Sequence, residues 1–194
     1  MTERSTRRVA IALLAGGSLA ASLCRTSDAG ARDPKFFPFD VPTVFYISKS
    51  DDHNRVDYGI HLDDRCVPAE NDAVFPYWRE FDNAPPVRVH GLGMFEYIPY
   101  GISEQRTIRK TPTGGLHFVK LRQFEKTAIG IITKKEADGH CSSQARSGIN
   151  GKECELTYVY VKLGTGGLTP SVEYVDLHGK DLDTGREVSE RIRR

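Results

Sequence analysis

Short runs of β-branched, aromatic and alternating residues recur along this chain from residue 43 onward. The run Val56–Leu62 alternates between apolar and other residues with a period of two, which is typical of a strand with one buried face. Leu156–Leu163 is the strongest run of this kind. No segment carries apolar residues at helical spacing over three turns, which argues against a helical core. The pattern predicts an all-β protein.

The predicted strands form a single domain, because no linker and no internal repeat follows residue 40. They are residues 43–48, 56–62, 74–81, 95–102, 107–110, 116–124, 128–133, 156–163, 171–177 and 187–192. About nine short strands separated by turn signals predict an antiparallel β-sandwich or a closed β-barrel. Periodicity alone does not separate these two architectures.

The N-terminal segment differs from the rest of the chain. Arg4, Arg7 and Arg8 form a basic start, and the apolar run Val9–Leu23 follows them. This run has about 15 residues, whereas a membrane-spanning helix needs ~20. A basic start before a short apolar run predicts a cleavable signal peptide over residues 1–31 rather than a retained membrane anchor.

Cleavage of this leader is expected after Ala31, with Ala20-Ala21 as a second possible site. Residues 32–43 would then be a lead-in and residues 44–194 the all-β domain, located in the periplasm or secreted. The general secretion route and the twin-arginine route both stay open. Lipid attachment at Cys24 is the less favoured alternative, because the bulky Leu23 precedes it.

Three of the four cysteines, namely Cys66, Cys141 and Cys154, would remain after cleavage. A disulfide is expected in an oxidising compartment, and we predict Cys141–Cys154 because these two are closest in sequence. Cys66 paired with either of them is the competing connectivity. A catalytic Cys141 is disfavoured, because the adjacent His140 would point to the opposite face of an extended chain.

Charge and motifs exclude several classes of function. The formal net charge of +1 predicts no broad attraction to nucleic acid or to an anionic membrane. We expect neither a metal nor another cofactor, because cysteine and histidine spacings fit no metal site. No catalytic residue is assigned. His61 would share a strand face with Asp57 and Asp63, which is the one hint of a polar site.

Several sequence blocks occur in a fixed order over nearly the whole predicted domain. They are Val44–Ser50 with Asn54–Val56, Tyr77–Arg79 with Phe81, Tyr97–Ile98 with Tyr100–Ile102, Ile149–Cys154, and Val172–Val175 with Gly179–Asp181 and Thr184–Gly185. As an ordered set they resemble the bacterial family called domain of unknown function 4833. The segment Ile98–Tyr100 is shorter than its counterpart in that family. The family's activity is unassigned, so the resemblance implies a domain type and no site residue.

Aromatic residues in the predicted strands carry the functional hypothesis. Tyr158 and Tyr160 would share one face of their strand, and Val159 and Val161 would face the core. Together with Trp78, the two tyrosines are the predicted ligand-binding residues. We expect an exported envelope protein that binds a small molecule, a glycan or an envelope protein without catalysis. The alternative is an extracytoplasmic hydrolase whose site is built from scattered Asp, His and Tyr.

Overall fold

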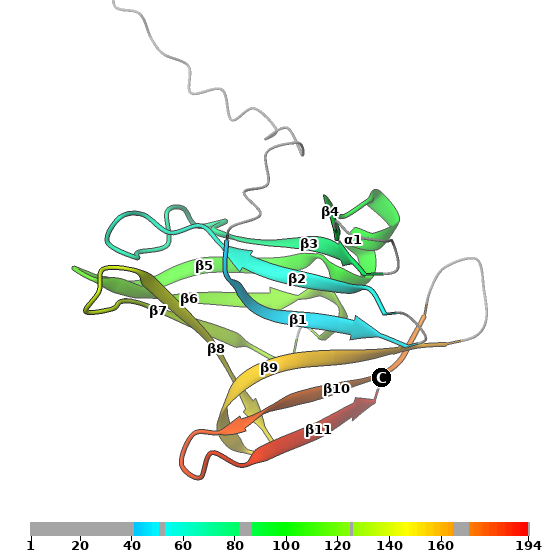
Figure 1. Ribbon diagram of the computed structural model, residues 1–194. Coiled ribbons are helices and arrows are strands. Elements are labelled where there is room, and N and C mark those ends of the chain that lie inside the picture. The colour runs from blue at the N-terminus through cyan, green and yellow to red at the C-terminus, as the bar shows by residue number, and fades with distance from the viewer. Residues whose placement is uncertain (1–40, 51–52, 82–86, 125, 165–170, 194) are drawn as a thin grey trace, which may run out of the picture. The chain divides into compact units, whose positions relative to one another are not determined.

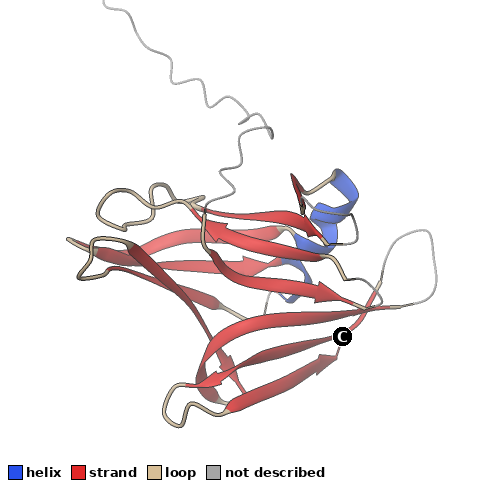
Figure 2. Ribbon diagram, viewed as in Figure 1, coloured by secondary structure: helices blue, strands red, loops and turns tan. Residues whose placement is uncertain are grey.

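The computed structural model describes residues 41–50, 53–81, 87–124, 126–164 and 171–193, and these are nearly all β (Figure 1). The strands are β1 (Thr43–Lys49), β2 (Arg55–Ile60), β3 (Val74–Glu80), β4 (Arg88–Gly91), β5 (Ile102–Thr111), β6 (Gly114–Leu121), β7 (Ile129–Lys135), β8 (Cys141–Ile149), β9 (Lys152–Leu163), β10 (Val172–Asp181) and β11 (Glu187–Arg193). One short helix, α1 (Met94–Tyr100), and the 3-10 turn η2 (Arg122–Phe124) complete them; both are blue in Figure 2. The predicted leader, its cleavage sites, Cys24 and residues 32–40 of the lead-in lie outside the described residues.

All eleven of these strands belong to one sheet. Its hydrogen-bonded order is β4-β3-β2-β1-β9-β8-β7-β6-β5, and β10 and β11 branch from β9. The path ends at β4 and β5, so no backbone ladder closes the sheet. The pairing of β1 with β9 is parallel, and the other pairings are antiparallel.

The long strand β9 is the branch point of the sheet. On one edge its residues Lys152–Glu155 pair with β8, and Tyr158–Val161 pair with β1. Its other edge pairs with β10. Figure 1 shows β8 running from the β5–β7 part of the sheet to β9. The change of partner between Glu155 and Tyr158 splits the sheet at this point.

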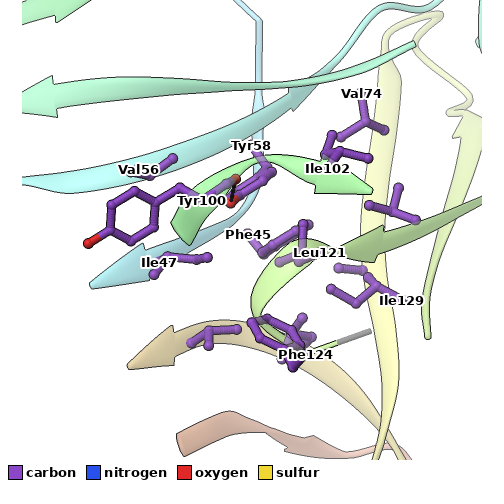
Figure 3. Close-up of a cluster of buried hydrophobic side chains, with 14 of the residues drawn as sticks. Phe45, Ile47, Val56, Tyr58, Val74, Tyr100, Ile102, Leu121, Phe124 and Ile129 are labelled. Carbon is purple, nitrogen blue, oxygen red and sulfur yellow. Dashed lines mark hydrogen bonds between the residues drawn. The ribbon is translucent and has the colours of Figure 1, made fainter. Parts of the chain in front are cut away.

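The core forms where the apolar faces of the strands meet (Figure 3). Phe45 of β1 and Tyr58 of β2 stack at 4.5 Å between ring centroids. The buried Tyr58 hydroxyl donates a hydrogen bond of 2.5 Å to the carbonyl of Tyr100. Val159 and Val161 of β9 are fully buried in the same cluster, as the alternation in this strand predicts.

A side chain links β5, at one end of the strand path, to β3, the second strand from the other end. The amide group of Gln105 in β5 donates to the carbonyl oxygen of Val74 in β3 at 3.1 Å, and it accepts a hydrogen bond of 3.0 Å from the Val74 N–H. These are the two groups that a neighbouring strand would otherwise satisfy. Gln105 therefore joins β5 to β3 where backbone pairing is absent.

The strand predicted at residues 95–102 is wrong in its first part, because residues 94–100 form α1. Gly93 begins the helix: its carbonyl accepts from the N–H of Glu96, and its N–H donates to the Glu96 carboxylate at 2.6 Å. Pro99 fits the last turn and the helix ends directly after it, at Tyr100. These local hydrogen bonds outweigh the β propensity of the aromatic and branched side chains.

Two of the eleven strands, β4 and β8, were not predicted. β4 is only four residues long and largely exposed. β8 is polar in sequence and buries small residues such as Ala145 and Ser147. Neither sequence carries the apolar alternation that marks a strand. The predicted short strand 107–110 belongs to the longer β5.

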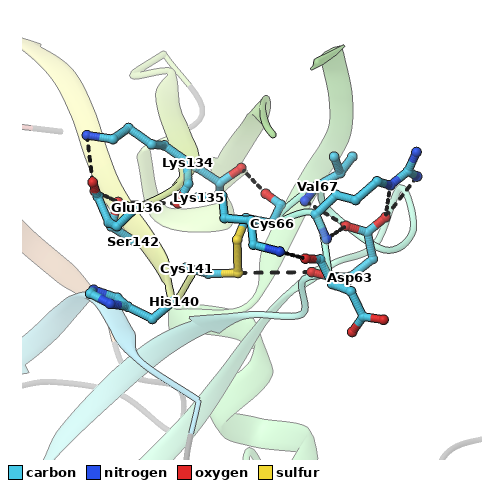
Figure 4. The surroundings of a disulfide bond; sticks show 12 residues. Asp63, Cys66, Val67, Lys134, Lys135, Glu136, His140, Cys141 and Ser142 are labelled. Atoms are coloured by element: carbon cyan, nitrogen blue, oxygen red, sulfur yellow. Dashed lines mark hydrogen bonds and ion pairs between the residues drawn. A yellow bond between two sulfur atoms is a disulfide. The ribbon is translucent and has the colours of Figure 1, made fainter. Parts of the chain in front are cut away.

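The disulfide joins Cys66 to Cys141, so the predicted Cys141–Cys154 bridge is wrong (Figure 4). In the β8–β9 hairpin Cys154 pairs with Ser147, and Cys141 lies six residues further along β8. At ~3.4 Å per residue this separation is about 20 Å, whereas a disulfide needs Cα atoms within about 7 Å. Cys154 is buried with a free thiol. The competing connectivity through Cys66 is the one formed.

The bridge holds the β2–β3 loop against the rest of the sheet. Thr133 in β7 donates a hydrogen bond of 2.7 Å to the Cys66 carbonyl, and Lys135 donates one of 2.8 Å to the carbonyl of Asp64.

Within the described ranges, no helix has the length and apolarity needed to cross a bilayer.

Candidate functional site

Three flat side chains stand in a row on the face of the sheet opposite the core. Tyr46 of β1 stacks on Tyr158 of β9 at 5.3 Å, with 9° between the ring planes. Tyr158 stacks in turn on His178 of β10 at 4.3 Å and 7°. The strand registers place these residues side by side, since Tyr158 is the partner of both Tyr46 and His178. We call them the aromatic row.

The rings of the aromatic row cover one another's faces across β1, β9 and β10. All three residues are half-buried. Among the hydrogen bonds within the described part of the chain, none uses the hydroxyl of Tyr46 or Tyr158 or a ring nitrogen of His178. The row therefore offers three polar groups for a ligand.

Two hollows flank the row. The larger, about 340 Å³, lies where β9 changes partner, between the start of β1 and Glu155–Thr157. The smaller, about 230 Å³, lies beside Tyr158 and His178. Both include Thr157 and Lys180, so they adjoin one another across the branch point. A ligand spanning both would lie along the aromatic row.

Tyr158 keeps its hydroxyl proton at neutral pH. Burial raises the pKa of Tyr158 above the ordinary value of 10.0, and the neighbouring Tyr46, Glu187 and Asp176 raise it further. A neutral phenol both donates and accepts hydrogen bonds. The group suits recognition of hydroxyl, amide or carboxylate oxygens.

Arg55 extends the aromatic row by one cation. Its guanidinium lies 4.4 Å from the ring centroid of Tyr46 and also lines the larger hollow. The Arg55 Nε donates to Asp57 at 2.6 Å, and Arg79 Nε donates to the other carboxylate oxygen at 2.6 Å. Asp57 is fully buried, so it fixes both arginines from beneath. One carboxylate against two guanidinium groups leaves net positive charge here.

A second row lies next to the first on β9–β11. Tyr160 and Tyr174 are 6.3 Å apart between ring centroids, and Arg191 lies 3.8 Å from the Tyr174 ring. Arg191 also binds Asp176 through two hydrogen bonds of 2.8 Å. Here the arginine is neutralised by its own carboxylate, unlike the pair around Asp57.

The structure separates the three residues predicted to bind a ligand. Tyr158 and Tyr160 are half-buried on the outer face. Trp78 lies in the core, 5% exposed, with its indole ring edge-on to Tyr100 at 5.6 Å. It pairs with Val56, on the inner side of the sheet. The tryptophan and the two tyrosines therefore do not share a face.

His61, Asp57 and Asp63, which the sequence predicted on one strand face, do not form a common polar site. Asp57 is held by the two arginines, and Asp63 accepts hydrogen bonds from the backbone N–H groups of Arg65 and Val67. His61 stacks on Phe75 at 4.3 Å. The three residues of the hint thus have separate surroundings.

Sequence reasoning missed Tyr46, His178 and Arg55. Alternation in their strands was sufficient to place Tyr46 opposite Phe45 and His178 opposite Leu177. It did not indicate that β1 lies beside β9, because these two strands pair across more than 100 residues of sequence. The missing information was the strand order.

The described residues contain no group of three or more His, Cys, Asp or Glu side chains able to hold a metal ion. The outer face instead combines unused hydroxyl groups, partly compensated arginines and shallow hollows. These features support binding of a polar ligand.

Comparison with known proteins gives one match. The model of the family described as "Domain of unknown function (DUF4833)" matches residues 45–191. No curated protein and no solved structure matches the chain.

Proposed function

The chain belongs to the family of the domain of unknown function DUF4833, and on that premise we propose that it is a non-enzymatic binding module. The outer face of β1, β9 and β10 would hold an extended, acidic glycan. The observation that carries this proposal is the aromatic row, whose three polar groups are unused and whose residues line two adjoining hollows.

The charges around the hollows support a glycan that bears carboxylates. Arg55 and Lys180 can each donate to a carboxylate, and Arg55 is pre-positioned by Asp57. Glu155 and Glu187 line the same hollows and can accept hydrogen bonds from sugar hydroxyls. Donors for carboxylates and acceptors for hydroxyls are the two sets of groups that an acidic sugar needs.

We place this activity outside the cytoplasm. The Cys66–Cys141 bridge is compatible with an oxidising compartment. The predicted leader supports the same location, and its removal is tested by the intact mass of protein recovered from cells that express it with residues 1–31. A mature chain that begins at Arg32 is the expected result. An uncut chain would contradict the proposal of export.

For the frame that carries the site, we infer a barrel-like closure in which Gln105 replaces backbone pairing between β5 and β3. The open edges at β4 and β5 would otherwise invite pairing with other chains. A rigid frame of this kind favours a preformed binding face over one that is assembled on binding.

A hydrolase is the second candidate, because Asp176 and His178 lie two residues apart on the same face of β10. Arg191 occupies both carboxylate oxygens of Asp176 and lowers its pKa. A carboxylate engaged in this way is poorly placed to orient His178 as a general base. This arrangement favours binding over hydrolysis.

Isothermal titration with tetragalacturonate tests the proposal, with maltotetraose as the neutral comparison. The wild-type protein should bind the acidic sugar and not the neutral one, and it should release no shorter product. Tyr46→Phe/Tyr158→Phe removes only two hydroxyls and should weaken binding about tenfold. Tyr97→Phe on α1 is the matched control and should bind as the wild type does.

Absence of tetragalacturonate binding by the wild type would overturn the proposed acidic glycan. Equal binding of maltotetraose would overturn the role of the cations. Cleavage of the tetramer would move the assignment to the hydrolase. An unchanged affinity in the double Phe variant would remove the aromatic row from the site.

A further inference from the structure

A further hollow in the described part of the protein lies away from the aromatic row. It measures about 510 Å³, within the range of about 300–1,000 Å³ typical of small-molecule sites. Its walls come from η2, the residues that follow it, the start of β10 and the end of β11. We call it the end cavity, because the ends of several elements line it.

The floor of the end cavity is apolar. Phe124, Val172 and Val175 line it, and all three are buried members of the main core cluster. Ile192, which pairs with Val175, adds a fourth apolar side chain. An alkyl chain seated here would extend the core and leave water at ~0.8 kcal/mol per methylene.

The rim of the end cavity is cationic. Arg122, Lys126 and Arg193 line it, and all three are exposed. None of the described residues that line the cavity is acidic. Arg122 contacts the ring of Tyr97 at 5.2 Å, whereas none of the ion pairs within the described residues uses Lys126 or Arg193. An anionic head group would find partners at this rim.

Apolar surface continues beside the end cavity on α1. Met94 and Phe95 of this helix are 84% and 78% exposed, and Ile98 is 56% exposed. The helix packs against η2, where Gln123 donates to the Ile98 carbonyl at 3.4 Å. Clustered exposed apolar side chains mark an interaction surface. The helix that carries them contacts η2, which forms part of the cavity wall.

We propose that the end cavity binds a single-chain anionic amphiphile, with the alkyl chain against Phe124, Val172 and Val175 and the head group between Lys126 and Arg193. This second site is independent of the acidic glycan site on the outer face. The ligand class follows from one apolar floor, one cationic rim and a hollow of suitable size.

Isothermal titration with dodecanoate near neutral pH tests the end cavity. Dodecanoate should bind the wild type, decanoate should bind about tenfold more weakly, and dodecyltrimethylammonium should not bind. Lys126→Glu/Arg193→Glu should weaken dodecanoate binding about tenfold or more. Arg109→Glu/Lys110→Glu on β5 makes the same charge change on exposed residues far from the cavity lining and should bind as the wild type does.

Thr127→Trp tests the volume without altering a charge, because this side chain lines the cavity and a larger one should fill it. We expect loss of dodecanoate binding with an unchanged circular dichroism spectrum. The proposal fails if the wild type does not bind dodecanoate, or if the alkylammonium binds as tightly. It also fails if the two charge-reversal variants behave alike. None of these outcomes bears on tetragalacturonate binding.

Discussion

His117 Nε2 lies 3.2 Å from the side-chain oxygen of Gln105, inside the core. That oxygen already accepts the N–H of Val74, so His117 must donate through Nε2–H. Its Nδ1 then accepts from the hydroxyl of Thr107 at 3.1 Å. One neutral tautomer satisfies the whole chain of contacts, which connects β6, β5 and β3.

Gln105→Ala removes the link between β5 and β3. The N–H and carbonyl of Val74 and the Nε2–H of His117 would all lose their partner. We expect the free energy of unfolding in urea to fall by about 2–3 kcal/mol. Gln144→Ala on β8 is the control and should cost less than about 1 kcal/mol, because within the described residues its side chain accepts one hydrogen bond, from the half-buried Arg146. Equal losses would contradict a structural role for the Gln105 link between β5 and β3.

His117 makes stability depend on pH. Burial lowers the pKa of His117 to about 4, from an ordinary value of 6.5. Below pH 6.5 His117 binds a proton in the unfolded chain but not in the folded protein. The free energy of unfolding therefore falls as the pH falls towards 4. The contribution is complete above pH 6.5, and its loss reaches about 3 kcal/mol. Urea titrations across this range should give a shallower slope for His117→Asn; an identical slope would contradict the assignment.

The Cys66–Cys141 bridge should be the main covalent contribution to stability. It spans 75 residues, and closing a loop of this length stabilises by about 4 kcal/mol on the chain-entropy estimate. Cys66→Ser/Cys141→Ser should lose about this amount in urea titrations. Peptide mapping should recover the Cys66–Cys141 pair. A Cys141–Cys154 peptide would contradict the structure.

Cys154 provides an internal check on that connectivity. Its thiol is buried, and burial raises its pKa. The thiol should resist alkylation in the native protein and react once after unfolding without reductant. Rapid alkylation of Cys154 in native buffer would contradict this burial.

Strands with a strong apolar period were predictable from sequence, and polar ones were not. β9 was predicted because Val159 and Val161 alternate with tyrosines. β8 buries Ala145 and Ser147, whose small size suits a strand paired on both edges but gives no periodic signal. Missing β8 also hid the distance between Cys141 and Cys154, so the wrong bridge followed from the wrong element.

The candidate site could be predicted only in part from the sequence, because periodicity gives the face of a residue but not its neighbours. Alternation placed Tyr158 on an outer face but did not show what lies beside it. Tyr46 comes from β1, more than 100 residues away, and His178 comes from β10, whose register with β9 shifts next to this residue. Local pattern fixes which side of a strand a residue occupies. Strand order depends on long-range packing, which periodicity does not record. The sequence of β3 did not show that Trp78 is buried, since a strand aromatic suits either face.

Two variants of Tyr158 distinguish the contribution of its ring to stability from the contribution of its hydroxyl to binding. Tyr158→Ala loses two stacked contacts across the sheet and should cost about 2 kcal/mol of stability while the protein still folds. Tyr158→Phe keeps the ring and should cost less than about 0.5 kcal/mol. Thermal melts of both variants measure this difference. Unfolding of Tyr158→Ala would make the ring primarily structural.

Asp57 should be the most sensitive carboxylate on the outer face. It is fully buried and binds Arg55 and Arg79, whose side chains are 31% and 25% exposed. Asp57→Asn leaves two guanidinium groups without their shared counter-ion, and partial exposure lets water compensate some of that loss. We expect about 2 kcal/mol of destabilisation in urea, together with weaker tetragalacturonate binding because Arg55 is no longer fixed.

Asp176→Asn is the matched control for this prediction, because Asp176 also binds an arginine but lies nearer to solvent. Arg191, its partner, is 47% exposed, and such ion pairs contribute about 1 kcal/mol or less. The two variants should therefore differ by about 1 kcal/mol or more in unfolding free energy. If the two variants lost the same small amount of unfolding free energy, Asp57 would not anchor Arg55 and Arg79. The proposed positioning of Arg55 would then lose its basis.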